Sequence, residues 1–191
     1  MHKDGKPISS FSSQDTWENW LSKNHDISDG IWIKFYKKDS GLASFVYKEA
    51  LDTALCYGWI DGQVNRYDEK SYLQKFTPRR KGSNWSQRNT EHAARIIKEG
   101  KMKPAGLTEI EKAKSDGRWD KASAPPSETV IPEDFLKEIN KNTKAKDFWE
   151  KLNKTNKYTM VWQIDEAKKE ETRTKRIKKF VDMLENGQKL Y

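Results

Sequence analysis

Residues 47–58, YKEALDTALCYG, decide the fold because they encode one amphipathic helix with a defined end. Side chains that can face a core recur at the spacing of one helical face, at Tyr47, Ala50, Leu51, Ala54 and Leu55. Glycine commonly ends a helix, because it adopts a left-handed backbone conformation without strain. We therefore predict a helix that begins near Tyr47 and stops at Gly58.

Strands are predicted on both sides of this helix. Upstream, residues 31–36 (IWIKFY) alternate between two faces, as a half-buried strand does. Downstream, residues 63–67 and 71–76 are typical of the two arms of a hairpin, joined by a turn at residues 68–70. The strand and the hairpin together predict a small β-sheet packed with helices, which is an α+β fold.

Two adjacent prolines divide the chain. Helical spacing before them predicts a helix after a cap at Ser12 or Ser13, one over about residues 87–99, and one over about residues 107–116. The break itself is SAPPS, residues 123–127, because proline continues neither a helix nor a central strand. Beyond it, Pro132 is expected as a first helical residue, followed by three or four short helices. We predict an α+β lobe over residues 1–122 and a helical lobe over residues 128–191.

The composition excludes several classes of protein. The 191 residues carry a net charge of +8, and 34% are hydrophobic, with 8 Trp. So many aromatic residues argue against disorder, and no run approaches the roughly 18 apolar residues of a membrane span. A polar N-terminus and a single cysteine, Cys56, favour the cytoplasm and exclude an internal disulfide. We expect Cys56 to be a packing residue.

The positive charge is concentrated in the middle of the chain, where residues 63–122 carry 15 basic and 8 acidic side chains. Residues 77–88 (TPRRKGSNWSQR) place bases around a predicted helix start, where backbone N–H groups already carry partial positive charge. Such an arrangement predicts an anion site. Its candidate residues are Arg79, Arg80, Ser83, Asn84, Trp85, Ser86 and Arg88, with Trp85 as a stacking face. The alternative is a solvated loop whose arginines pair with Asp61, Asp68 or Glu91.

A second candidate group follows the central helix, at Trp59, Asp61 and Gln63. Asp61 could serve as a carboxylate base or bind a polar ligand beside Gln63. In the alternative interpretation, which we favour, Trp59 fills the core and Asp61 shapes a turn with Gly62. The sequence has no phosphate-binding loop motif, no serine elbow and no cluster with metal-ligand spacing, so no cofactor or metal is predicted. The interpretation therefore favours a binding protein over an enzyme.

Several short segments form a recognisable set: residues 17–21 (WENWL), 30–32 (GIW), 54–62 (ALCYGWIDG), 75–80 (KFTPRR), 83–86 (SNWS), 100–102 (GKM), 116–119 (DGRW) and 167–177. Together they resemble the YdeI/OmpD-associated family, over almost the whole chain from about Trp17 to Leu184. The resemblance implies a role in protection against bacteriocins and cationic antimicrobial peptides, and it supplies no catalytic residues.

The sequence is compatible with three functions. A chain with net charge +8 repels a cationic peptide, so we expect a protective or stress-related role to act through an anionic small molecule or macromolecule. The second hypothesis is a nucleic-acid-binding protein that uses the same basic segment. The third is a small-molecule enzyme with Asp61 as base and Arg79 or Arg80 as an anion clamp.

Overall fold

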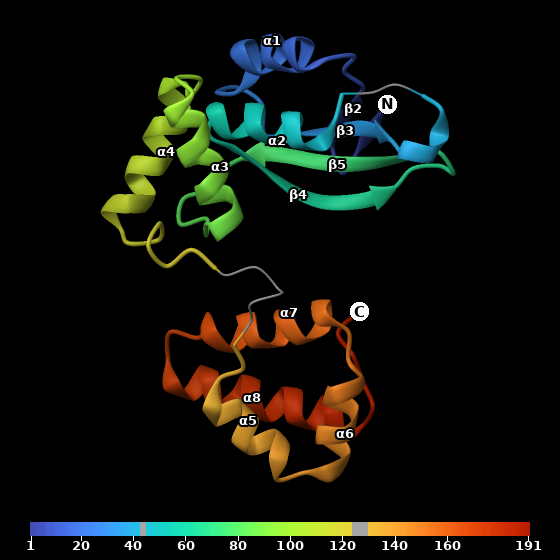
Figure 1. Ribbon diagram of the computed structural model, residues 1–191, viewed down its shortest axis with the longest axis vertical. Coiled ribbons are helices and arrows are strands. Elements are labelled where there is room, and N and C mark those ends of the chain that lie inside the picture. Colours follow the sequence, from blue (N-terminus) through green and yellow to red (C-terminus); the bar gives the residue numbers. More distant parts are fainter. Residues whose placement is uncertain (43–44, 124–129) are drawn as a thin grey trace. The chain divides into compact units, whose positions relative to one another are not determined.

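The computed structural model describes residues 1–42, 45–123 and 130–191 (Figure 1). The chain divides into two compact units, Met1–Ser123 and Ala124–Tyr191. The first unit combines a sheet with helices and the second is helical, so the predicted α+β fold is confirmed. The predicted break at residues 123–127 lies outside the described residues except for Ser123.

The first unit contains a five-stranded sheet with the order β1-β2-β3-β5-β4. Its strands are β1 (His2–Lys3), β2 (Lys6–Ser9), β3 (Ile31–Tyr36), β4 (Trp59–Arg66) and β5 (Ser71–Pro78). Strands β2 and β3 run parallel, and the other neighbouring pairs are antiparallel. The strand predicted at residues 31–36 has the observed bounds, whereas β4 starts four residues before the predicted arm, directly after Gly58.

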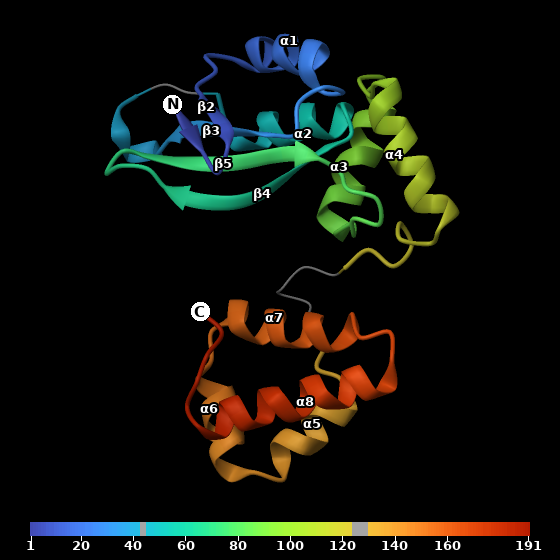
Figure 2. The same cartoon turned by 180° about the vertical axis from the view of Figure 1, so that it is seen from behind.

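Helices cover one face of this sheet and one of its ends. They are α1 (Gln14–Asn24), α2 (Tyr47–Cys56), α3 (Gln87–Lys98) and α4 (Pro104–Ser115), together with a short 3-10 turn η1 (Lys38–Ser40). Both views show α1 and α2 on the same face, and α3 and α4 beside one end (Figures 1 and 2). Ser13 caps α1 by accepting a hydrogen bond from the backbone of Thr16. Helix α4 begins at Pro104, three residues earlier than predicted, because proline suits a first helical turn.

Helix α2 separates two hydrophobic cores. Ala50 and Ala54 belong to the core between the sheet and α1, which also contains Trp17 and Trp59. The adjacent positions Leu51 and Leu55 belong to a second core formed with α3 and α4. The small side chains let α2 lie close to the sheet, and the large ones fill the space on its other side. The single helix predicted from residues 47–58 therefore organises both cores.

Helix α4 approaches α2 at a glycine. A Cβ atom built on Gly106 would lie 2.5 Å from the carbonyl oxygen of Cys56 and 2.6 Å from that of Leu55. It would also lie 2.5 Å from the sulfur of Met102. Real Cβ atoms do not come so close to backbone oxygens, so only glycine permits this helix contact.

We predict that Gly106→Ala destabilises the protein. An alanine in the interior of a helix is ordinarily favourable by roughly 1 kcal/mol relative to glycine, but here overpacking should cost about 1–3 kcal/mol. Urea denaturation measures the difference. Glu111→Ala, at an exposed position of the same helix, is the control and should change the free energy of unfolding by less than about 0.5 kcal/mol. A Gly106→Ala protein as stable as the wild type would contradict the close contact.

The second unit, over its described residues, is a bundle of four helices. They are α5 (Glu133–Asn140), α6 (Thr143–Lys151), α7 (Lys154–Asp165) and α8 (Glu170–Glu185). Its core includes Phe135, Met160 and Phe180, which are fully buried. The prediction that Pro132 is the first helical residue is wrong by one position. Its φ of −58° suits a helix, but its ψ of 138° is extended, so it caps α5 from outside.

A bidentate ion pair joins α5 to α8. Arg173 Nε lies 2.6 Å from Asp134 Oδ2, and Arg173 Nη2 lies 2.9 Å from Asp134 Oδ1. The hydrogen bonds from Arg173 hold the pKa of the Asp134 carboxyl below its ordinary value. A carboxyl with a lowered folded-state pKa stabilises the fold above its unfolded pKa, and this contribution is lost as the pH falls through the folded-state pKa.

We therefore predict that Asp134→Asn lowers the melting temperature at pH 7. The deficit should shrink as the pH falls below about 4, where the unfolded chain binds a proton, and disappear once the pH is below the lowered pKa of the native carboxyl. Thermal unfolding followed by circular dichroism from pH 7 to pH 2.5 measures both effects. Asp147→Asn removes an exposed carboxylate that has no ion pair in the part of the chain described, and it should show neither. A deficit that is constant with pH would argue against the ion pair as its cause.

Candidate functional site

The candidate site is built around Arg79, the residue directly after β5. Its backbone N–H donates to the carbonyl oxygen of Gly58 at 3.0 Å, which continues the β4–β5 ladder by one residue. Its side chain is only 8% exposed. Nη1 donates to the carbonyl oxygen of Asn84 at 3.1 Å, and the guanidinium carbon lies 3.5 Å from the ring centroid of Trp85. The guanidinium is thus stacked on an indole, a favourable contact for a cation.

Two further donors of Arg79 have no partner in the described part of the chain. Nε and Nη2 are buried and make no hydrogen bond to any described residue. None of the ion pairs among residues 1–42, 45–123 and 130–191 includes Arg79. Burial lowers the pKa of the guanidinium to about 10, so it stays charged at pH 7. Glu109 and Asp61 are near enough to attract this charge, but neither forms an ion pair with Arg79 in the described residues. A buried charge without a direct partner costs free energy, so this group requires an explanation.

Arg79 lines a cleft of about 440 Å³ at the end of α4. Basic, acidic and small residues share its wall: Arg79, Lys81, Gly82, Glu109, Lys112, Ser115, Asp116 and Arg118. Four of these side chains are cationic and two are carboxylates, which gives the cleft a net charge of +2. Among the charged members, sequence analysis named Arg79 as a site candidate and included Lys81 in the same basic segment, residues 77–88.

The two carboxylates of the cleft are already paired with bases of the cleft. Arg118 lies 2.8 Å from Asp116 and also donates to the carbonyl oxygen of Ser83 at 2.6 Å. Lys112 lies 2.8 Å from Glu109. These pairs leave Arg79 and Lys81 as the excess positive charge, and the Arg118 contact fixes the loop over Arg79.

The loop that carries Asn84 is held at both ends. Gly82 has a φ of +76° in a turn closed by a hydrogen bond from the Ser83 N–H to the carbonyl oxygen of Arg80. Ser86 caps α3 by accepting from the N–H of Asn89. Ser123, the last residue of the first unit, donates its N–H to the carbonyl oxygen of Trp85 at 3.0 Å. Trp85 is thereby fixed as the platform under Arg79.

The structure separates the other predicted residues from this cleft. Arg80, Asn84 and Arg88 have exposed side chains, and Ser83 and Asn84 take part through their carbonyl oxygens. Trp85 is 3% exposed with one face against Arg79, so it offers no open stacking surface. None of the three predicted acids pairs with an arginine of the loop, as far as the described residues go.

The second candidate group, Trp59, Asp61 and Gln63, also lies outside the described lining of the cleft. Trp59 is 1% exposed in the first core, and its indole N–H donates to the carbonyl oxygen of His25 at 2.9 Å. Asp61 accepts a hydrogen bond from the Tyr47 hydroxyl at 2.6 Å, and Gln63 is exposed. Burial and this contact raise the pKa of Tyr47, so it is not a proton donor near neutral pH.

Sequence reasoning missed the five members of the cleft that lie outside residues 77–88: Glu109, Lys112, Ser115, Asp116 and Arg118. They come from the second half of α4 and the turn after it, more than 25 residues beyond Arg79. One signal was present, because residues 116–119 (DGRW) repeat the combination of arginine and tryptophan. Trp119 packs against Trp85 with ring centroids 4.9 Å apart, which brings the two segments together.

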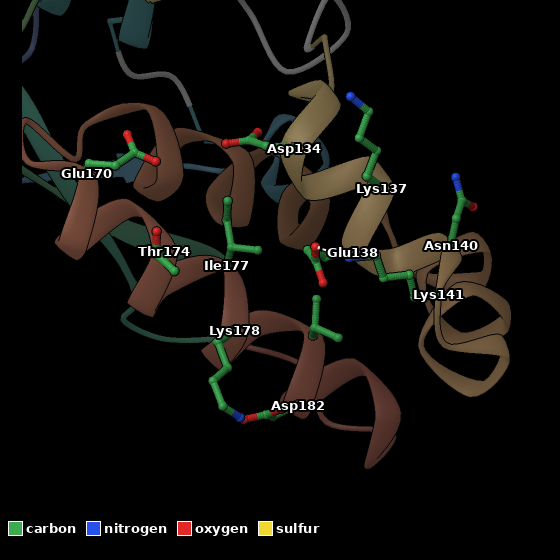
Figure 3. Close-up of a pocket in the computed structure, with 11 residues that line it drawn as sticks. Asp134, Lys137, Glu138, Asn140, Lys141, Glu170, Thr174, Ile177, Lys178 and Asp182 are labelled. Carbon is green, nitrogen blue, oxygen red and sulfur yellow. Dashed lines mark hydrogen bonds and ion pairs between the residues drawn. The ribbon is translucent and has the colours of Figure 1, made fainter.

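The second unit has a larger groove, of about 910 Å³, between α5 and α8 (Figure 3). Its wall includes the apolar side chains of Ile177 and Val181. The charged side chains around it are mostly paired, as in Lys178 with Asp182 at 2.8 Å. None of the buried, unpartnered polar atoms found in the described residues lies there. The groove therefore shows no comparable demand for a ligand.

Two further absences hold for the described residues. They contain no group of three or more His, Cys, Asp or Glu side chains that could hold a metal ion. Within the same residues, the helices are too short or too polar to cross a membrane.

Comparison with known proteins assigns the two parts of the chain separately. Residues 9–109, slightly more than half of the chain, match the family described as a domain of unknown function (DUF8412). The chain belongs to the DUF8412 family. Residues 128–187 match the family described as "Bacteriocin-protection, YdeI or OmpD-Associated", which confirms the predicted resemblance to that family. Comparison with curated proteins and with solved structures gave no match.

The DUF8412 match includes Arg79 and Gly82, whereas Asp116 and Arg118 follow it. Most of the segments that carry the resemblance to the YdeI/OmpD-associated family also lie within residues 9–109, and the YdeI/OmpD-associated match itself covers the second unit. The cleft is therefore formed by the DUF8412 region and the segment directly after it.

The cysteine of the DUF8412 region is unsuited to nucleophilic chemistry. Cys56 is buried, and desolvation raises the pKa of its thiol to about 11. On the same helix, Asp52 accepts from Arg95 at 2.6 Å and lies 2.6 Å from His92 Nδ1, so this histidine is held by a carboxylate. The prediction that Cys56 is a packing residue is consistent with its place in the second core.

We predict that native Cys56 reacts slowly with iodoacetamide at pH 8. Raising the thiol pKa from 9 to about 11 lowers the thiolate fraction about 100-fold, and the gain in intrinsic nucleophilicity recovers only about tenfold. The rate, followed by mass spectrometry, should be at least tenfold below that of the urea-unfolded chain. Equal rates would show that the thiol is accessible and unperturbed.

Proposed function

We propose that this DUF8412 protein binds a small anionic molecule in the Arg79 cleft, without catalysing a reaction, and that its contribution to bacteriocin protection acts through this ligand. One observation carries the proposal. Arg79 is buried and charged, and two of its donors have no partner among the described residues. A bound anion would supply the missing acceptors and offset the desolvation of the charge.

The charge of the cleft supports an anionic ligand over a cationic one. Its lining has a net charge of +2, and the whole chain has a net charge of +8. A cationic peptide would therefore be repelled both at a distance and at the site. The protective role comes from the description of the family that matches residues 128–187. An anionic ligand reconciles that description with the charge of the chain.

The enzyme hypothesis has less support. Its proposed base, Asp61, accepts a hydrogen bond from the Tyr47 hydroxyl and does not belong to the described lining of the cleft. Asp61 is near enough to Arg79 to attract its charge, but its carboxylate is engaged by Tyr47 and lies outside the described lining of the cleft. A nucleic acid is also an anion, through its phosphodiester backbone. Its binding differs from that of a small anion in its steep dependence on salt concentration.

The test is loss of ligand-induced stabilisation in Arg79→Met. Methionine fills a similar volume without charge, and it removes a buried cation whose Nε and Nη2 have no partner among the described residues, so it should not destabilise the unliganded fold. Without ligand, the variant should melt at or above the wild-type temperature. Addition of inorganic phosphate at constant ionic strength should raise the melting temperature of the wild type and leave that of Arg79→Met unchanged.

Arg80→Ala is the matched control, since it removes the same charge from the adjacent, exposed position. It should keep the full shift, because Arg80 does not line the cleft. Arg79→Lys provides a second variant that keeps the charge but loses the planar fork, and it should bind about tenfold more weakly. An undiminished shift in Arg79→Met, or no shift in the wild type with any anion, would overturn the proposal.

The biological role is tested with the same pair. Bacteria that express the wild-type protein or Arg80→Ala should survive a bacteriocin challenge equally well, and those that express Arg79→Met should lose the protection. Immunoblotting checks that all three proteins accumulate equally. Equal protection by Arg79→Met would separate the cleft from the protective role.

A further inference from the structure

We infer that the ligand of the Arg79 cleft is a phosphate monoester of a small polyol or sugar. This inference rests on the proposed function and specifies its ligand. Three properties of the cleft lead to it: the arrangement of the free donors of Arg79, the charge balance of the lining, and the character of the remaining wall.

The free donors of Arg79 lie on one edge of the guanidinium. Nη1 is engaged by the carbonyl oxygen of Asn84, which leaves Nε and Nη2. These two nitrogens point their N–H groups in parallel, the arrangement that binds two oxygens of one carboxylate or phosphate group. The ligand therefore presents a pair of oxygens on one anionic group, and a halide or a neutral hydroxyl would satisfy only one donor.

The charge balance favours a doubly charged group. The lining contains four cationic side chains and two carboxylates, and both carboxylates are paired within it. A phosphate monoester carries about −1.5 to −2 at pH 7 and neutralises this excess. A phosphate diester or a simple carboxylate carries a single charge and would leave the cleft positive.

The rest of the wall fits hydroxyl groups better than an aromatic base. Glu109 and Asp116 offer carboxylate oxygens that accept hydrogen bonds from hydroxyls, and Ser115 adds a small polar side chain. The indole of Trp85, in contrast, is buried and covered by Arg79, so no described ring is open to stack on a nucleobase here. A cleft of about 440 Å³ is within the roughly 300–1,000 Å³ range of small-molecule sites. It exceeds what a phosphate ion alone would fill.

Access to Arg79 requires a small movement. Nε and Nη2 have essentially no accessible surface, so a ligand reaches them only when a side chain of the cleft moves aside. Lys81 is exposed and forms no ion pair with any described residue, which leaves its side chain able to move. Its ammonium group can then turn toward the same phosphate, because Lys81 also lines the cleft.

Isothermal titration calorimetry at pH 7.5 and constant ionic strength tests the ligand class. We expect glycerol 3-phosphate to bind the wild type at least tenfold more tightly than dimethyl phosphate, its singly charged counterpart, or succinate, a dicarboxylate. Adenosine 5′-monophosphate should bind no more tightly than glycerol 3-phosphate. Arg79→Met should abolish these heats of binding, and Arg80→Ala should retain them.

A pH series provides a second readout. The second pKa of a phosphate monoester is about 6, so lowering the pH from 7.5 to 5 should weaken glycerol 3-phosphate binding about tenfold. The groups that face the ligand are the four cations and two carboxylates of the cleft, and no histidine is present in the described lining. Dimethyl phosphate does not titrate in this range, and its binding measures any change in the protein itself.

The outcomes separate this inference from the proposed function. Dimethyl phosphate or succinate binding as tightly as glycerol 3-phosphate would overturn the phosphate-monoester inference and leave an anion site. A tighter complex with adenosine 5′-monophosphate would overturn the polyol assignment. An oligonucleotide that binds more tightly than any of these, with a steep dependence on salt, would replace both by a nucleic-acid interface. Failure of all anions to bind would reject the proposed function as well.

Discussion

The first unit depends on the burial of one helix from two sides. Helix α2 faces the sheet with Ala50 and Ala54, and it faces α3 and α4 with Leu51 and Leu55. The carbonyl oxygens of Leu55 and Cys56, at the C-terminal end of α2, leave room for α4 only because α4 has a glycine, Gly106, at the point of contact. The end of α2 also positions the candidate site, because the chain turns at Gly58 into β4 and the carbonyl oxygen of the same glycine accepts from Arg79. A constraint that serves packing thus determines where the buried guanidinium lies.

The charge of Arg79 is stabilised differently from that of two other arginines of the protein. Arg173 and Arg118 are stabilised by carboxylates, whereas Arg79 has an indole, one carbonyl oxygen and two unmatched donors. Stacking on Trp85 contributes roughly 2 kcal/mol, which is less than the several kcal/mol that removing a guanidinium from water costs. The two hydrophobic cores of the first unit supply the stabilisation against which this local cost is set. A residue retained at such a cost is more readily explained by what it binds than by what it stabilises.

The sequence was sufficient where a signal is local. The alternation of residues 31–36 and the helical spacing of residues 47–55 gave β3 and α2 directly. It was insufficient for β2, whose four residues contain little apolar surface and pair in parallel with a strand over 20 residues away. The site shows the same limit. Arg79 and Arg80 are adjacent and chemically identical, and only the direction of the chain after β5 buries one and exposes the other. Arg118 joins them through a tryptophan contact that no local rule contains.

The hydrogen bonds of Ser123 give the first unit a mechanical property. This residue precedes the second unit, and its N–H and carbonyl groups bind the backbone on either side of Ser86, at Trp85 and Gln87. The segment that leaves the first unit is thus tethered to the indole on which Arg79 rests. A force applied to the chain at Ser123 would therefore act, through these backbone hydrogen bonds, on the residue whose ring supports the guanidinium.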